Sequence, residues 1–391
     1  MAAGDVGTFQ TGTLNSSGKV TYTTHAGRGG EVVFLLDGKD YRTKMTVEQY
    51  NYEYGDGDLY THQTAQTGNG VNIVIMGDCF DAKDIAEGKY LQAMKDAYNY
   101  FFDIEPYATY KDYFNVYTVF GMSADSGMGT VNTIREARFG SQYTLNEGVS
   151  PNFETVFAGA CTVDAINDNV SNTLVILVEN SNEYSGLCYM WGDGSAVALV
   201  PMSTDPAPYD FQGLVHHEAG GHGFGKLADE YIYHNAFIQS CSCICCGHTD
   251  AINAMKSYGF YTNISLSGSM QEVPWSHMIY DPQYSNVVDV YEGAYMHTRG
   301  VFRSEATSCM NNNIAYYNAI SRESMVKRIM KYAGEPYSYE AFKAKDYESL
   351  PKSSQLSLPT WSGESTVSYS RYGQREPKFM GEKPKFNKNK F

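Results

Sequence analysis

Residues 216–231, HHEAGGHGFGKLADEY, constrain the fold more than any other stretch of this chain. His217 and Glu218 begin a pattern similar to H-E-x-x-H, in which one helix presents two histidines and a general base to a zinc ion. Here His222 follows His217 by five positions instead of four. An α-helix turns about 100° per residue, so this spacing separates the two rings by about 140° rather than about 40°. A regular α-helix therefore cannot present both histidines to one metal ion.

A local distortion of the helix would restore a shared face. One π-bulge absorbs an extra residue, and such bulges are frequent at functional sites. Gly220 and Gly221 lie between the histidines and have no side chains to clash in a distorted turn. We therefore expect a bulged helix that begins near Phe211. His216 is expected to lie outside the ligand set, either exposed or supporting the site.

A catalytic zinc takes three protein ligands and keeps one position open for water. His217 and His222 would supply two ligands, and Glu218 stands where such helices place the general base. The glycines after His222 allow the helix to end, so the third ligand can come from the following chain. Asp229 is the first choice and Glu230 the reserve, and the other acid would orient a histidine through its second ring nitrogen. The alternative, a glycine-rich helix end with two surface histidines, is disfavoured because so many ligand types gather here.

Composition and charge exclude several functions. A net charge of −15 and a pI near 5.0 argue against nucleic acid or an anionic membrane as a partner. The chain contains no run of about eighteen apolar residues, which is the length that a membrane-spanning helix needs. The start, MAAGDVGTFQ, lacks the basic and apolar regions of a signal peptide. This start fits either an intracellular protein or the mature form of an exported one.

The order of predicted elements indicates an α+β fold. Apolar runs predict strands at 71–80, 113–122, 173–180 and 195–203. Helical patterns predict one helix at 81–106, capped by Asp81 or Asp84, and another at 316–334, which ends at Gly334. This order predicts a mixed sheet with helices packed on it. We expect a β-rich segment at 1–64 with strands within 18–48, a linker at 61–70, a catalytic domain at 65–335 and an extended tail at 336–391.

Three other features have weaker functional signals. The stretch CSCICCGH at 241–248 contains one C-x-x-C pair, for which disulfides in an exported protein are favoured over a structural zinc. YGDGDLY at 54–60 lacks the glutamate that a calcium loop needs at its twelfth position, so a polar turn is expected. Asp78 follows the first strand of the domain and is expected to brace the end of the sheet.

The chain resembles the M64 peptidases, typified by bacterial immunoglobulin A peptidase. The family carries H-E-x-G-H followed by x-x-x-x-L-x-D-E-Y, and Gly221-His222, Leu227 and Asp229-Glu230-Tyr231 match its second part. VNIVIMGDCFDAKDI, EPYATYKDYFNVYTV and GVFRSEATSCMNN resemble further family segments, so the likeness covers roughly 65–335. The inserted residue between Glu218 and His222 departs from the family. Dipeptidyl peptidase III has a similar H-E-x-x-x-H helix that does bind zinc.

The resemblance implies a zincin-type domain of metzincin character that uses Zn²⁺ to hydrolyse proteins or peptides, a host glycoprotein among them. Met310 would form the methionine turn beneath the metal, although a core methionine is the simpler interpretation of the residue alone. Zinc-bound water would attack the scissile carbonyl, Glu218 would shuttle its proton, and Arg303 or a tyrosine would stabilise the oxyanion. An extended substrate is expected along an edge strand at 195–202.

We therefore expect a zinc endopeptidase, secreted or in the cell envelope of a bacterium, whose signal peptide is not in this chain. The main alternative is a catalytically inactive peptidase fold that serves in binding or adhesion, which the inserted residue motivates. A second alternative is an enzyme that cuts an amide bond of a cell-wall peptide. The sequence does not predict the oligomeric state.

Overall fold

The computed structural model describes residues 31–36, 39–44, 52–144, 148–240, 249–346, 348 and 375–391. A short antiparallel hairpin, β1 (Glu31–Leu36) with β2 (Lys39–Lys44), falls within the predicted β-rich segment. The cysteine-rich stretch 241–248 lies outside the described residues.

A mixed seven-stranded sheet forms the centre of the protein, as predicted. Its order is β15-β9-β10-β8-β4-β5-β3. The strands are β3 (Leu59–Gln63), β4 (Val71–Asp78), β5 (Phe114–Val119), β8 (Leu174–Glu179), β9 (Leu187–Met190), β10 (Ala196–Pro201) and β15 (Lys378–Phe379). Four of them, β10, β8, β4 and β5, are parallel, and the first three are continuous apolar runs, typical of strands covered on both faces. β9 runs antiparallel to β10, and β3 runs antiparallel to β5.

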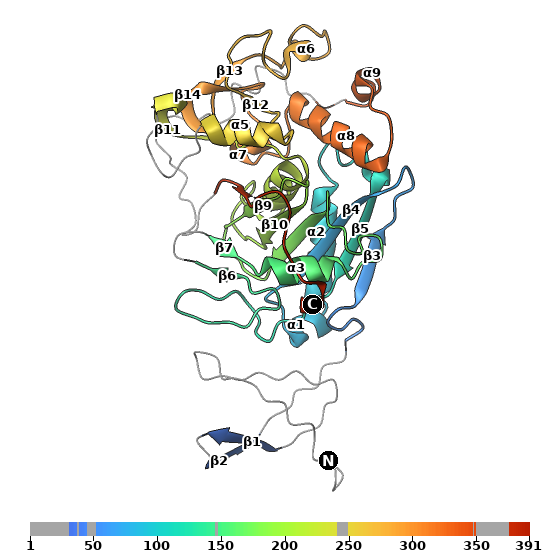
Figure 1. The fold of residues 1–391 in the computed structure, drawn as a ribbon, viewed down its shortest axis with the longest axis vertical. Helices are drawn as coiled ribbons and strands as arrows, with labels where there is room; N and C mark the ends of the chain where they lie inside the picture. The colour runs from blue at the N-terminus through green and yellow to red at the C-terminus, as the bar shows by residue number, and fades with distance from the viewer. Residues whose placement is uncertain are drawn as a thin grey trace.

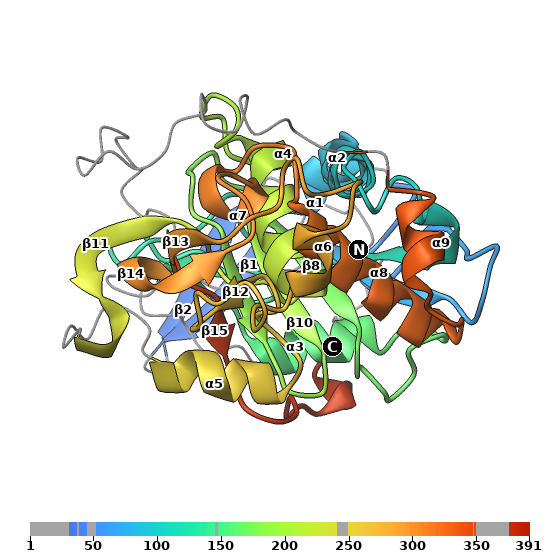
Figure 2. The ribbon, with the colours of Figure 1, turned by 90° about the horizontal axis from the view of Figure 1, so that it is seen from above.

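Helices cover both faces of this sheet, and alternate side chains of each strand enter two separate cores. In β4, Ile73 and Ile75 face the core that contains the site helix, whereas Val74 and Met76 face the core that contains α3 (Phe153–Ala160). The first core also holds α2 (Lys89–Phe101), α4 (Phe211–Leu214), the π-helix η2 (Val215–Phe224) and α8 (Ala319–Ala333). Figure 2 shows α2 and α3 on opposite sides of β8 and β10.

A second, smaller sheet lies at one end of the central one (Figure 1). It contains β11 (Ile232–Phe237), β12 (Ile264–Ser265), β13 (Tyr291–Ala294) and β14 (Met296–Arg303). The remaining short elements are α1 (Ala82–Ala86), η1 (Lys111–Tyr113), β6 (Gln142–Tyr143), β7 (Val149–Ser150), η3 (Ile238–Ser240), α5 (Thr249–Ser257), α6 (Ser276–Ile279), α7 (Cys309–Asn312), α9 (Tyr339–Lys343) and η4 (Lys388–Lys390).

Several local predictions are confirmed. Asp81 caps α1 by accepting hydrogen bonds from the backbone N–H groups of residues 83 and 84. Gly334 ends α8 in the left-handed conformation. Asp78 braces the sheet end, because its carboxylate accepts backbone N–H groups of residues 79, 139 and 141 and the hydroxyl of Ser123. Residues 54–60 contain a polar turn in which Asp58 accepts the N–H of Gly55.

Two predictions about strands and helices are wrong. Residues 195–202 do not form a sheet edge, because β10 pairs with β9 on one side and β8 on the other. The predicted helix at 81–106 is two helices, since Gly88 adopts a φ of 80° between them. Such a turn interrupts the helix at a residue without a Cβ.

The expected linker and tail also contain regular structure. The linker at 61–70 overlaps β3, which pairs with β5. The tail at 336–391 contains α9, β15 and η4 rather than being extended throughout. Aromatic residues hold its end on the domain: Phe386 lies 5.7 Å from Phe157 and Phe391 lies 5.9 Å from Phe139, between ring centroids. No described helix is both long enough and apolar enough to cross a membrane.

Candidate metal centre

The site helix begins as an α-helix and continues as a π-helix. Asp210 caps its start by accepting the N–H of Gly213 at 3.0 Å. Residues Val215–Phe224 then form a π-helix, so the expected distortion extends over ten residues instead of a single bulge. The i→i+5 bonding of a π-helix makes residues five apart neighbours along its axis. The spacing of His217 and His222 therefore matches the helix that carries them.

The two central glycines allow neighbours to approach this helix closely. A Cβ on Gly220 would lie 2.3 Å from the hydroxyl of Tyr317, and one on Gly221 would lie 2.2 Å from Met310 Sδ. Tyr107 donates to the carbonyl of Gly220 at 2.6 Å, and Tyr317 donates to the carbonyl of His216. These phenols satisfy helix carbonyls inside the core, where an unpaired carbonyl would be costly.

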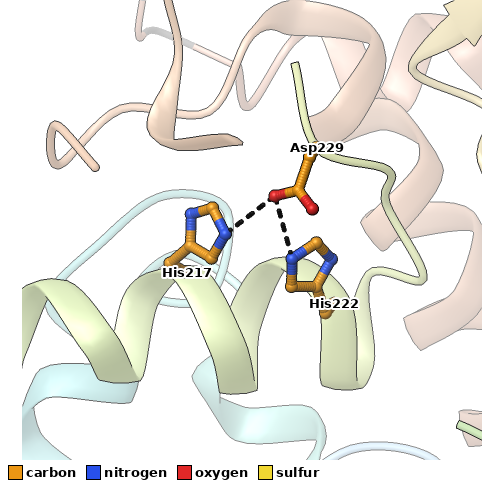
Figure 3. Close-up of side chains that lie close together, drawn as sticks. All are labelled: His217, His222 and Asp229. Atoms are coloured by element: carbon orange, nitrogen blue, oxygen red, sulfur yellow. Dashed lines mark hydrogen bonds and ion pairs between the residues drawn. The ribbon is translucent and has the colours of Figure 1, made fainter. Parts of the chain in front are cut away.

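His217, His222 and Asp229 converge on one point (Figure 3). Their ligand atoms all lie within 4.8 Å of one another, and all three side chains are buried. Asp229 Oδ1 lies 3.1 Å from His217 Nε2 and 3.2 Å from His222 Nε2. This is the one group of three or more such ligands found among the described residues.

The hydrogen bonds around the histidines fit a cation between these atoms. His217 Nδ1 lies 3.1 Å from the carbonyl of Cys309, and His222 Nδ1 lies 2.8 Å from the carbonyl of Leu227. A carbonyl accepts, so each Nδ1 carries the proton and, in a neutral ring, each Nε2 presents a lone pair. Both lone pairs then face a carboxylate, an arrangement that a cation relieves. Two imidazoles and one carboxylate are a donor set that zinc accepts.

The chain after the helix turns sharply to bring Asp229 back. Lys226 adopts a φ of 53°, and the N–H of Leu227 bonds to the carbonyl of Gly221 at 3.1 Å. The Asn263 side chain then holds the backbone of Ala228 by two hydrogen bonds. It accepts the N–H of Ala228 at 2.9 Å and donates to the carbonyl of Ala228 at 2.8 Å. Burial raises the pKa of Asp229, but the positive charge and hydrogen bonds that the two imidazoles provide when protonated outweigh burial and lower that pKa to about 2. The carboxylate is therefore ionised and available as a ligand.

Glu230, the reserve ligand, does not join this cluster. Its carboxylate accepts hydrogen bonds from Asn263 at 2.9 Å, Asn318 at 2.8 Å and Ser308 at 2.5 Å. The N–H of Glu230 also bonds to the carbonyl of Met310 at 2.7 Å. Glu230 therefore joins the loop after the helix to the segment around Met310, and it does not orient a histidine as expected for the second acid.

Met310 and Arg303 have different places relative to the cluster. Met310 is buried in α7 with its sulfur against Gly221, between the two histidines along the helix. Arg303 is directed to the backbone, donating to the carbonyls of residues 292, 293 and 306. The Arg303 guanidinium thus holds β13 and the loop after β14, and its contacts are not those of a group that stabilises an oxyanion.

Glu218 is a buried carboxyl beside the cluster. Neither of its oxygens has a hydrogen-bond partner among the described residues. Burial raises the pKa of Glu218 to about 8, with Asp229 adding to the effect and His217 opposing it. A Cβ on Gly186 would lie 2.6 Å from Glu218 Oε1, so the start of β9 lies directly against this carboxyl. An unpaired carboxyl with a pKa near neutrality is suited to accept and return a proton.

Three further residues support the site, and the sequence suggested such a role only for His216. His216 is buried and lies 2.6 Å from Asp103, which ties the helix to the chain just after α2. Asn263 comes from a part of the chain with no recognisable motif. The Tyr231 hydroxyl is buried beside Asp229, and its ring stacks on His217 with centroids 6.5 Å apart. The family pattern D-E-Y was the available signal for Tyr231.

The fold and the site together define a class of protein: a mixed α/β domain that carries side chains able to ligate a metal on a helix packed against its central sheet. Residues 60–240 match the family model described as IgA Peptidase M64, which confirms the resemblance found in the sequence. The match runs from β3 to η3 and includes the site helix and Asp229. It indicates a peptidase, and hence a hydrolase whose substrates are proteins. No curated protein matches the chain.

Proposed function

We propose that this protein is a zinc-dependent endopeptidase in which His217, His222 and Asp229 hold the metal and Glu218 is the general base. The observation that carries the proposal is the orientation of the two imidazoles: both Nδ1 atoms face backbone carbonyls, and both Nε2 atoms face Asp229 Oδ1. The family match supplies peptide-bond hydrolysis as the reaction. Zinc, when bound, supplies an activated water molecule and polarises the scissile carbonyl.

Glu218 would take the proton from the attacking water and give it to the leaving amine. Its position supports this role, because it is adjacent to His217 and its oxygens are not held by other groups of the described chain. Arg303 is left out of the mechanism because its guanidinium bonds to backbone carbonyls. The Tyr231 hydroxyl, buried beside Asp229, is the better-placed donor to the oxyanion.

The finer features of the fold belong to the same proposal. We propose a zincin of metzincin character with Met310 in the methionine turn, supported by the contact of its sulfur with Gly221. The catalytic domain at 65–335 would also include β3 and β15, since both strands belong to the central sheet. An extended protein or peptide substrate would lie along β9 rather than β10, because β9 starts beside Glu218. Secretion or envelope location in a bacterium, and a host glycoprotein as substrate, rest on the family resemblance.

A binding or adhesion protein is not favoured. That alternative was motivated by the inserted residue, and the π-helix accommodates this residue with the ligand side chains still together. A cell-wall peptide as substrate would leave the same site chemistry in place, and a panel of peptides and glycopeptides distinguishes it.

The test compares zinc content and proteolysis in the wild type, Glu218→Gln and Glu183→Gln. The wild type should bind one equivalent of zinc and cleave an unfolded protein such as casein. Glu218→Gln should keep the zinc and lose about 10²–10⁴-fold in kcat, the usual contribution of a general base. Glu183→Gln, which changes an exposed acid, should behave as the wild type. If the protein binds stoichiometric zinc but cleaves no protein or peptide, the proposal that it is an endopeptidase is refuted.

A further inference from the structure

The outer edge of β9 is occupied by the chain's own C-terminal segment, residues 376–382. β15 pairs with β9 in parallel, Lys378 with Tyr189 and Phe379 with Met190. Three further backbone bonds of 2.8 Å extend this pairing: Met380 N–H to the carbonyl of Met190, Gly192 N–H to that of Gly381, and Asp193 N–H to that of Glu382. The segment therefore uses the backbone groups that an added peptide strand would use. Figure 1 shows it, in dark red, beside β9.

Side-chain contacts hold the segment in this position. Phe379 lies 5.0 Å from Tyr258 between ring centroids, and Lys378 Nζ lies 5.6 Å from the ring of Tyr189. Pro377 is buried. Beyond the segment, the chain end is fixed on the opposite core through Phe386 and Phe391. The segment is thus attached to the domain by its own contacts and by the anchored terminus.

The register brings Glu376 towards the metal centre. Extended two positions before the Lys378–Tyr189 pair, the parallel register would set Glu376 opposite Leu187, the first residue of β9 and the neighbour of Gly186. Gly186 contacts Glu218. Burial raises the pKa of three tyrosines, and the charge of Glu376 adds to the rise at each of them: Tyr231, Tyr261 and Tyr295. The charge of this carboxylate therefore acts on three tyrosines, of which Tyr231 stacks on His217.

The residues of the candidate site are buried. His217, Glu218, His222 and Asp229 are each 0% exposed, whereas a protein substrate has to reach them. We propose that residues 376–382 are an intramolecular inhibitor that occupies the substrate edge of β9 and is displaced before an extended peptide binds. This inference rests on the proposed function for its catalytic consequence, while the blocking of the β9 edge can be tested by binding alone.

The test uses the full-length protein with Met380→Pro, which removes the N–H that bonds to Met190, and Met380→Ala, which keeps it. The probe is a fluorescein-labelled synthetic peptide, EPKFMGEK, that copies residues 376–383. Fluorescence anisotropy should show that Met380→Pro binds it about tenfold more tightly than the wild type or Met380→Ala, the factor that corresponds to about one hydrogen bond. Phe379→Ala, which removes the contact with Tyr258, serves as a second release variant if Met380→Pro does not fold.

Cleavage of casein provides the second readout. Met380→Pro should cleave faster than Met380→Ala by a similar factor, and added unlabelled peptide should reverse the gain. Equal peptide affinity in all three proteins would overturn the proposal. Tighter peptide binding with an unchanged cleavage rate in an active enzyme would also overturn it, because the segment would then be a structural strand only. If neither the wild type nor the two variants cleave any substrate, the proposed function fails. The comparison of peptide binding alone then decides whether the segment blocks the edge of β9.

Discussion

At the residue scale, the site combines buried carboxyl groups whose pKa values differ from their usual values. Glu218 has no hydrogen-bond partner in the described chain, and burial raises its pKa to about 8. Asp229 is equally buried, yet its two histidines hold its pKa at about 2. Two carboxyls that are both buried at the site are thus suited to different tasks, one to ligate and one to carry a proton. The difference between their pKa values arises from their neighbours, since both carboxyls are fully buried.

Tyr231 is expected to act in the reaction more than in folding. Its hydroxyl is buried beside Asp229 without a well-formed hydrogen bond in the described chain, so Tyr231→Phe should change the free energy of unfolding little. If the hydroxyl donates to the oxyanion, the same change should lower kcat by about 10²–10³-fold, as the loss of one such donor does elsewhere. Steady-state kinetics, zinc content and thermal unfolding measure the three quantities. An unchanged kcat would assign Tyr231 to packing.

Lys226 should make stability depend on pH. Burial and the nearby Arg328 lower its pKa to about 7, and its Nζ donates to the carbonyl of Ser195 at 3.2 Å. The unfolded chain keeps this lysine protonated up to about pH 10.5, so between pH 7 and 10.5 unfolding takes up a proton. Stability should therefore rise with pH in this window, by up to about 1.4 kcal/mol per unit from this group. Lys226→Met should remove that slope in urea unfolding, whereas the exposed Lys385→Met should retain it.

At the scale of elements, apolar runs and glycines predicted much of the structure. β4, β8 and β10 were predictable because strands covered on both faces are apolar throughout. The distorted helix was predictable because the five-residue spacing is incompatible with an α-helix. β15 was not, since a two-residue strand gains its stability from long-range pairing and has no periodicity of its own. The place of β9 between β15 and β10 likewise depends on pairings that sequence patterns do not specify.

The same limit applies within the site. His217, His222 and Asp229 were selected from residue types and spacing, and the structure brings their ligand atoms together. The sequence could not separate Asp229 from Glu230, because adjacent acids have similar chemistry and only backbone direction distinguishes them. The side chains that bond to Glu230 come from segments distant in sequence, and they are Asn263, Ser308 and Asn318. Such a network is visible only after folding.

The π-helix should be sensitive to any side chain at Gly220. In Gly220→Ala the new Cβ would lie 2.3 Å from the Tyr317 hydroxyl, which also donates to the carbonyl of His216. Overpacking of this kind costs about 1–3 kcal/mol, and a shifted helix should also weaken zinc binding. Gly55→Ala is the matched control, because its Cβ would make ordinary contacts at 3.5 Å and 3.6 Å. Urea unfolding and zinc titration of both variants test this, and equal stability of the two would contradict the packing argument.

At the scale of the whole molecule, the candidate metal centre joins parts of the chain that are far apart. The site helix packs in the core on one face of the central sheet. The residues after it bond to the segment around Met310 and lead into β11 of the second sheet. A cation held by His217, His222 and Asp229 would therefore stabilise the junction of the two sheets. Its removal would leave two imidazole lone pairs and a carboxylate facing one another in a buried site.

Chelation should consequently lower the stability of the whole fold. A ligand that binds only the native state stabilises it by about 2.7 kcal/mol at one hundred times its Kd, so removing zinc should lower Tm by several degrees. Differential scanning calorimetry with 1,10-phenanthroline, followed by added zinc, measures the loss and its recovery. His217→Ala supplies the control, because a protein that lacks one ligand should show a much smaller shift with the chelator. An identical shift in this variant would show that the chelator acts elsewhere, and no shift in the wild type would contradict a structural contribution of the metal.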